Sequence, residues 1–371
     1  MIRRPPRSTL SPSSAASDVY KRQITSSVGF YPTSDSTAAT KKKLSSFRRM
    51  VRNFSRVDTN YIEPQKFNFT VMLQNTISFE GYTLRTNDNH KVVLAPKPSY
   101  KLGPYFGWRF IFLGYTIDLK HLKSEAREAL DFSLYAPQVG LDIFFRKSGK
   151  NYLINRVDYG NRFIEKAMKS HSFNGFETSE SGINAYYIFN HSKFSYPAAY
   201  SQSTIQRRSA GSALAGISYS KHKLNMDWDK FHNLMDDVAG SGTAQEVSDT
   251  TMHFTKIDYS DISIGGGYAY NWVFAHNWLF DLSLQLALGY KQLSGKENDF
   301  FRNFNFKNIM LDGVSRVGLV WNNMRWYSGA SAVFHSYNYH KSSFSANTMF
   351  GNVYIYAGYN FGLKKQYRKK R

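Results

Sequence analysis

The 371-residue chain contains no cysteine. This absence excludes disulfide bonds, thiolate nucleophiles and zinc sites built on cysteine. The sequence also lacks any run of about 18 consecutive apolar residues, so it contains no segment typical of a transmembrane helix. The mean hydropathy is low, at −0.47. A low mean does not exclude a transmembrane β-barrel, because only alternate residues of a barrel strand face lipid.

Acidic residues are scarce relative to basic ones: 27 Asp and Glu against 48 Lys and Arg give a formal net charge of +21. A basic chain suits anionic partners such as lipid head groups, phosphate or nucleic acid. Residues 364–371 are strongly basic, but they contain one aromatic residue, Tyr367, and no recognisable nucleic-acid-binding fold. We therefore expect no nucleic-acid partner and interpret this segment as a basic periplasmic tail.

Residues 1–23 differ in character from the rest of the chain. Segments 1–9 and 13–23 can be read as a sequencing adaptor and a transposon end translated in frame, so we exclude residues 1–23 from the fold as an artefact. We expect the native start of the protein, with any signal peptide, to be missing from this chain.

Residues 24–60 form a basic N-terminal segment that we expect to be partly disordered or helical. Leu44, Phe47, Val51 and Phe54 recur in it at helical spacing. This spacing suits an amphipathic helix on a membrane or against a barrel mouth. A solvated charged helix is the alternative.

The clearest strand pattern runs from Trp278 to Tyr290. Large apolar residues alternate there with small or polar ones, and the aromatic residues stand at both ends of the apolar face. From Phe280 to Tyr290, at ~3.3 Å per residue and a tilt of ~40°, this face is about 25 Å tall, which matches the lipid-facing band of an outer-membrane barrel. The residues predicted to face lipid are Trp278, Phe280, Leu282, Leu284, Leu286, Leu288 and Tyr290.

Similar alternation elsewhere predicts an all-β fold for residues 61–363: a closed antiparallel transmembrane β-barrel of about 12 strands, with 10 or 14 as alternatives. Closure is expected because hydrocarbon cannot satisfy the backbone groups of an open sheet edge. Short periplasmic turns are predicted at 275–277 and 322–323. Longer external loops are predicted near 229–257, 294–303 and 340–346. Residues 129–147 are predicted to be one strand with a bulge at Ala136 and Pro137.

Several charged and polar residues have the opposite, inward parity. They could line a channel, or they could pair with one another and plug a narrow lumen. These possible lumen-lining residues are Asp281, Gln285, Lys291, Asp312, Arg316 and Arg325.

No other pattern indicates a site strongly. Gly265, Gly266 and Gly267 lie within a predicted strand, where a phosphate-binding loop does not occur. Asp227, Asp229, His232, Asp236 and Asp237 contain oxygen ligands but lack the spacing of a calcium loop. Ser192, Ser195, Ser201, Ser203, His191 and His222 form no nucleophile motif. We therefore assign no catalytic, cofactor-binding or metal-binding residues.

Segments 58–76, 103–115 and 194–200 resemble an uncharacterised family of Gram-negative outer-membrane barrel proteins, and the resemblance covers about residues 45–365. It implies an outer-membrane location but no activity. We expect outer-membrane lipids and the barrel assembly machinery as partners, with an unknown cargo. A porin-like channel, transport or envelope-structural role is favoured. An enzyme acting on lipid or lipopolysaccharide is the alternative, and a soluble ligand-binding β protein is the second alternative.

Overall fold

The computed structural model describes residues 57–86, 90–108, 111–114, 117–118, 128–148, 151–243, 255–293, 308–341 and 344–368. The adaptor-like segment, almost all of the basic N-terminal segment and the predicted loop at 294–303 lie outside these residues. We describe the unit Val57–Arg371 by itself. None of the described helices is both long enough and apolar enough to cross a bilayer.

Strands dominate this unit, as the alternation predicts, and three short α-helices interrupt them. The elements in chain order are β1 (Ile62–Pro64), β2 (Phe67–Thr86), β3 (Lys91–Pro96), β4 (Ser99–Trp108), β5 (Ile111–Gly114), β6 (Ile117–Asp118), β7 (Glu128–Tyr135), β8 (Val139–Ser148), β9 (Tyr152–Asp158), α3 (Arg162–Met168), β10 (Ser172–Phe173), β11 (Phe176–Ile188), α4 (Tyr196–Tyr200), β12 (Thr204–Gln206), β13 (Ala210–Met226), α5 (Trp228–Ala239), β14 (Lys256–Ala275), β15 (Trp278–Leu293), β16 (Ile309–Asn322), β17 (Trp326–Lys341), β18 (Phe344–Leu363) and the 3-10 helix η2 (Lys365–Tyr367).

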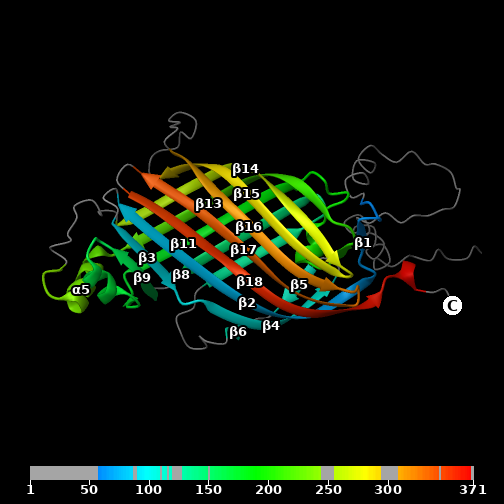
Figure 1. Ribbon diagram of the computed structural model, residues 1–371, viewed down its shortest axis with the longest axis horizontal. Coiled ribbons are helices and arrows are strands. Elements are labelled where there is room, and N and C mark those ends of the chain that lie inside the picture. The colour runs from blue at the N-terminus through cyan, green and yellow to red at the C-terminus, as the bar shows by residue number, and fades with distance from the viewer. Residues whose placement is uncertain are drawn as a thin grey trace, which may run out of the picture. The chain divides into compact units, whose positions relative to one another are not determined.

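One antiparallel sheet contains 16 of these strands. Its order is β10-β9-β3-β2-β18-β17-β16-β15-β14-β13-β11-β8-β7, and β4 pairs with β2, β5 and β6. Figure 1 shows the long strands lying tilted and side by side. The N-terminal strand β2 pairs with the C-terminal strand β18 along almost its full length, from Phe67 opposite Leu363 to Thr86 opposite Phe344. This ladder pairs the first and the last strand, in chain order, of the large sheet.

The sheet is apolar on one face and polar on the other. On β15, Leu282 and Leu284 are 56% and 52% exposed, whereas their neighbours Asp281 and Ser283 are buried. Exposed large apolar residues recur on β2, β4, β7, β8, β11, β13, β14, β16, β17 and β18. This is the reverse of a soluble protein, in which the apolar side chains are buried.

The polar face is concave. Arg316 on β16 pairs with Asp142 on β8, although four other strands separate β16 from β8 in the sheet. Arg146 on β8 likewise donates to Asn352 on β18, at 3.3 Å. Side chains can meet in this way only if the sheet is rolled around its polar face.

Both ends of the rolled sheet are covered. At one end, α3, α5 and β9 pack apolar side chains against the ends of the long strands, with Ile164, Phe231 and Ile154 buried. At the other end, the segment 189–209 carries α4 and β12. There Ala198 and Ala199 of α4 pack against Leu279 and Val320 of the wall. Figure 1 places α5 and β1 at opposite ends of the sheet.

Three local predictions need correction. Residues 129–147 are two strands, β7 and β8, joined by a tight turn in which the Ala136 N–H donates to the Val139 carbonyl at 3.0 Å. The change of parity at Pro137 therefore marks a reversal of the chain. A bulge within a single strand would produce the same change of parity in the sequence. The predicted loop at 229–257 contains α5, and the loop at 340–346 shrinks to two residues because β17 and β18 pair up to Lys341 and Phe344.

Close packing on the polar face gives a test of the β2–β18 region. A Cβ on Gly358 would lie 2.2 Å from Cζ of Tyr327. The Tyr327 hydroxyl is held by Thr70 at 2.8 Å, so the ring cannot move away easily. We expect Gly358→Ala to lower the free energy of unfolding by about 1–3 kcal/mol, the usual cost of overpacking.

The matched control is Gly81→Ala on β2, where a new Cβ would meet no atom within 4 Å. Replacing a strand glycine without a clash is neutral or slightly stabilising. Guanidinium unfolding followed by tryptophan fluorescence measures both variants. Equal stability of the two would contradict the packing described for Tyr327.

Candidate functional site in the sheet interior

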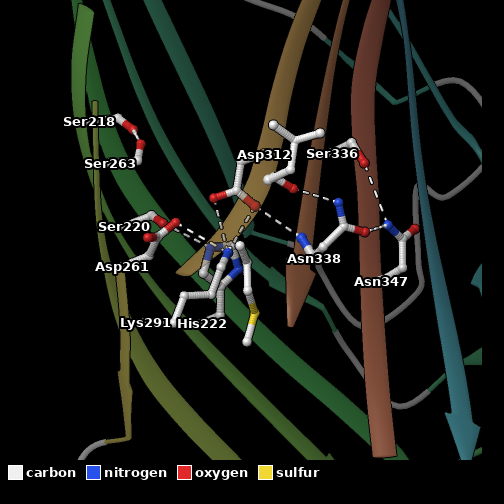
Figure 2. Close-up of polar contacts among 12 residues, drawn as sticks. Ser218, Ser220, His222, Asp261, Ser263, Lys291, Asp312, Ser336, Asn338 and Asn347 are labelled. Carbon is white, nitrogen blue, oxygen red and sulfur yellow. Dashed lines mark hydrogen bonds and ion pairs between the residues drawn. The ribbon is translucent and has the colours of Figure 1, made fainter. Parts of the chain in front are cut away.

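The polar face buries three clusters of charged side chains. In the first, Lys291 on β15 donates to Asp312 on β16, with Nζ to Oδ1 and Oδ2 distances of 2.9 and 3.0 Å, and to Oδ2 of Asp261 on β14 at 3.2 Å (Figure 2). The Asp312 carboxylate also accepts the backbone N–H of Asn338 at 3.0 Å. All three charged side chains are almost fully buried, so the cluster holds one cation between two carboxylates.

Beside this cluster, the Oγ of Ser220 and the Nε2 of His222 are 2.9 Å apart (Figure 2). This separation is within the range of a nucleophile and its base. Both side chains are buried, however, and His222 is stacked on the ring of Tyr259 with a centroid distance of 4.9 Å. Neither residue lines the large interior cavity described below. The contact therefore offers substrate no approach from that cavity.

The second cluster lies around Arg316. Its guanidinium pairs with Asp142 and stands over the ring of Tyr186, 4.9 Å from the centroid. Asp142 also accepts from the hydroxyl of Ser133 at 2.7 Å. Arg316 is completely buried, so it depends on these partners to offset its lost hydration.

The third cluster lies around Arg146 of β8. Nη2 of Arg146 donates to both carboxylate oxygens of Asp131 at 3.0 and 2.9 Å, and Nη1 lies 3.6 Å from Glu80. Glu180 is directly opposite Arg146 in the β8–β11 ladder. Both oxygens of the buried Glu180 carboxylate lack a hydrogen-bond partner. This cluster therefore also has more carboxylates than cations.

Between the second and third clusters the interior contains a cavity of about 190 Å³. Its walls come from β2, β4, β7, β8, β17 and β18, and from the segment that follows α4. The lining includes Asp131, Asp142 and His335. It also includes six tyrosines, which are Tyr105, Tyr135, Tyr200, Tyr327, Tyr354 and Tyr356.

Segment 189–209 closes one side of this cavity. The Tyr200 hydroxyl donates to Asp281 at 2.5 Å, and the Gln202 side chain donates to the Tyr356 hydroxyl at 3.0 Å. Asn271 on β14 donates to the Ser195 carbonyl at 2.9 Å. The segment is therefore held to the wall through polar contacts with several different strands.

Five of the six residues predicted to line the lumen lie on the polar face and are buried: Asp281, Gln285, Lys291, Asp312 and Arg316. The expectation for Arg325 needs correction. It lies in the turn before β17, is exposed, and places its guanidinium 5.6 Å from the ring centroid of Tyr359. Parity does not extend into a turn, because the backbone there no longer alternates.

The residues predicted to face lipid have the opposite placement. Trp278, Leu282, Leu284, Leu286 and Leu288 are exposed, and Phe280 and Tyr290 are partly exposed, all on the outer face of β15. Sequence reasoning missed Asp142, Arg146 and Glu180. Asp142 and Arg146 share the inward parity of β8, so that parity would have identified them once the turn at 136–138 was recognised. Glu180 lies between Ser179 and Ser181 on β11, where no apolar alternation marks the inward face.

The weaker candidate motifs receive structural explanations. Gly265, Gly266 and Gly267 lie inside β14, in strand conformation. Asp227 caps α5 by accepting the backbone N–H of Lys230 at 3.0 Å, and this hydrogen bond lowers the pKa of the Asp227 carboxyl. Within the described residues, no group of three or more His, Asp or Glu side chains is arranged to hold a metal ion.

A family model described as a domain of unknown function, DUF4421, matches residues 56–361. The chain belongs to this family. No curated protein matches it. The DUF4421 domain includes every described strand from β1 onward, except for the last two residues of β18.

Solved structures similar to the DUF4421 chain are outer-membrane proteins. The outer membrane protease OmpT of Escherichia coli has 8% identity and a TM-score of 0.33, with 82% of this chain and all of that chain covered. OprG of Pseudomonas aeruginosa has 8% identity and a TM-score of 0.24, with 81% and 98% covered. The toluene transporter TodX of P. putida has 7% identity and a TM-score of 0.19, with 80% and 91% covered. These scores are too low to transfer a function.

The buried Arg316 provides a test of the interior. We expect Arg316→Met to lower the free energy of unfolding by about 3–5 kcal/mol, because it leaves the Asp142 carboxylate buried without its cation. Replacing both partners, as Arg316→Met with Asp142→Leu, should recover much of this loss. Guanidinium titration measures all variants.

Arg156→Met is the control, because the Arg156 side chain is 60% exposed in its pair with Asp158. An exposed pair contributes about 0–1 kcal/mol. A cost for Arg316→Met no greater than that of the control would mean that the interior pair is hydrated and that the described burial is incorrect.

Proposed function

We propose that this chain is an integral outer-membrane β-barrel that acts as a gated conduit for a small solute, with its lumen shut in the state described. The observation that carries the proposal is the pairing of an apolar outer face with a buried charged inner face on the same strands. Outer-membrane lipids are its proposed surroundings and the barrel assembly machinery its proposed insertion partner.

The outer face supports a membrane location. Ile217 and Ile264 are 65% and 69% exposed on neighbouring strands, and the exposed leucines of β15 continue the same surface. Soluble monomers rarely expose apolar patches beyond a few hundred Å². A surface that is apolar on eleven strands is stable in lipid and would aggregate in water.

Closure of the sheet is part of the proposal. Among the described residues, β5 and β6 pair with β4, and β7 pairs with β8, which leaves one seam between these two groups. We propose that β5 and β6 are pieces of one strand that pairs with β7. The barrel then has 12 strands: β2, β4, β5 with β6, β7, β8, β11 and β13 to β18. In lipid, only a closed sheet satisfies every backbone group.

The covered ends support a gated conduit rather than a permanently open porin. The Arg316–Asp142 pair crosses the interior, and segment 189–209 is bonded to the wall beside the cavity. A solute can pass only if these contacts open. If these contacts never open, an envelope-structural role is favoured instead.

A charged substitution on the outer face tests the membrane location. Leu284 lies at the middle of the apolar stripe of β15. We expect Leu284→Arg to cost about 2–4 kcal/mol of unfolding free energy in lipid vesicles, as it does at a bilayer midplane. Gln292→Arg, on the same face near the strand end, should cost about 0–1 kcal/mol. Equal costs at the two positions would argue for a soluble sheet.

Planar-bilayer recording tests the gate. We expect the unmodified protein to be shut most of the time. Tyr200→Phe removes the hydrogen bond to Asp281. Because a hydrogen bond to a charged group contributes about 1.5–3 kcal/mol, the open probability should rise by about tenfold or more. Tyr268→Phe, on the outer face, is the control and should change nothing. If neither the protein nor Tyr200→Phe conducts, the conduit is excluded.

A further inference from the structure

We infer that the interior cavity is a binding site for a small organic cation. The inference deepens the proposed function, since it names the class of solute that the lumen accepts. It depends on which side chains face the cavity, how they are paired, and how much room they leave.

Among the residues that the structure describes, the acidic and basic side chains that line the cavity are all carboxylates. Asp131 and Asp142 both line it, whereas their cationic partners Arg146 and Arg316 do not. No lysine or arginine is among the described residues of the lining. The two guanidinium groups therefore lie behind the carboxylates, which present their remaining acceptor capacity to the cavity.

Buried carboxylates also outnumber buried cations over the whole described part of the interior. Around the three buried cations Arg146, Lys291 and Arg316, six carboxylates have side chains less than about a tenth exposed: Glu80, Asp142, Glu180, Asp261, Asp281 and Asp312. Unbalanced charge in a poorly hydrated interior is costly. Of these six carboxylates, Asp142 lines the cavity, so a cation bound there would lie against Asp142 and the less buried Asp131.

The rest of the lining suits an organic cation better than a hydrated metal ion. Six tyrosines line the cavity, and the electron-rich face of an aromatic ring attracts a cation that has shed its water. His335 also lines the cavity, where its imidazole adds a further polar ring beside the carboxylates.

The volume sets the size of the ligand. A water molecule occupies about 30 Å³ in the liquid, and an engineered cavity of about 150 Å³ holds benzene. The 190 Å³ here therefore accommodates one ring-sized body with a single charged group. Larger solutes would require segment 189–209 to move.

Benzamidine and benzamide provide a matched pair of probes, because they have nearly the same shape and only benzamidine is a cation at neutral pH. We expect calorimetry on the full chain folded in detergent to show benzamidine binding at least about tenfold more tightly than benzamide. Equal affinity would overturn the charge selection. Absence of binding by both at about 10 mM would overturn the site.

Two variants locate the probe. Asp131→Asn removes a lining carboxylate and should weaken benzamidine about tenfold while leaving benzamide unchanged. Ser331→Leu fills the cavity from β17 and should abolish binding of both probes. Asp237→Asn, on the exposed face of α5, is the control and should bind as the unmodified protein does. If Ser331→Leu folds and still binds benzamidine, the probe lies elsewhere and the assignment is wrong.

The binding measurement is independent of the gate, because it is made in detergent without a voltage or a second compartment. Binding without conductance would exclude the conduit and retain the cation site. Conductance without benzamidine selectivity would retain the conduit and exclude the site.

Discussion

The buried ion pairs constrain everything else in this molecule. A guanidinium such as that of Arg316 cannot lie in a dry interior unless a carboxylate lies against it. Its partner, Asp142, is on a strand separated from it by four others in the sheet. The sheet must therefore roll for the pair to form, and the roll turns the apolar side chains outward. The buried ion pairs and the apolar outer surface therefore both depend on the same curvature of the sheet.

The contacts that hold the wall together are of two kinds. The Lys291 cluster joins the adjacent strands β14, β15 and β16, whereas the Arg316–Asp142 and Arg146–Glu80 pairs join strands that are not neighbours, across the interior. In the proposed conduit, the pairs that cross the interior would also obstruct the lumen. Segment 189–209 adds contacts that are mostly single hydrogen bonds to the wall, such as the one from Tyr200 to Asp281. Breaking those bonds costs less than breaking a buried ion pair, so the segment is the element best suited to move.

The excess of carboxylates gives the interior a chemical preference that its shape alone would not. A cavity walled by tyrosines would accept many ring-sized solutes. With Asp131 and Asp142 in the lining and their guanidinium partners outside it, the proposed site would favour solutes that carry positive charge. The strongly basic character of the whole chain therefore does not extend to its interior.

The sequence by itself determined which face is apolar on regular strands such as β15, because the period of two is a local property that survives any arrangement of the strands. For this reason it located β15 and the turn before it, predicted at 275–277 and observed between Ala275 and Trp278. It failed at Pro137, where a bulge and a chain reversal change parity alike, and at Arg325, where the strand had already ended. Only the tertiary structure decided which charges meet, because Arg146 and Asn352 are 206 residues apart and Arg316 and Asp142 are 174 apart. Such contacts depend on the roll of the whole sheet, which no local pattern encodes.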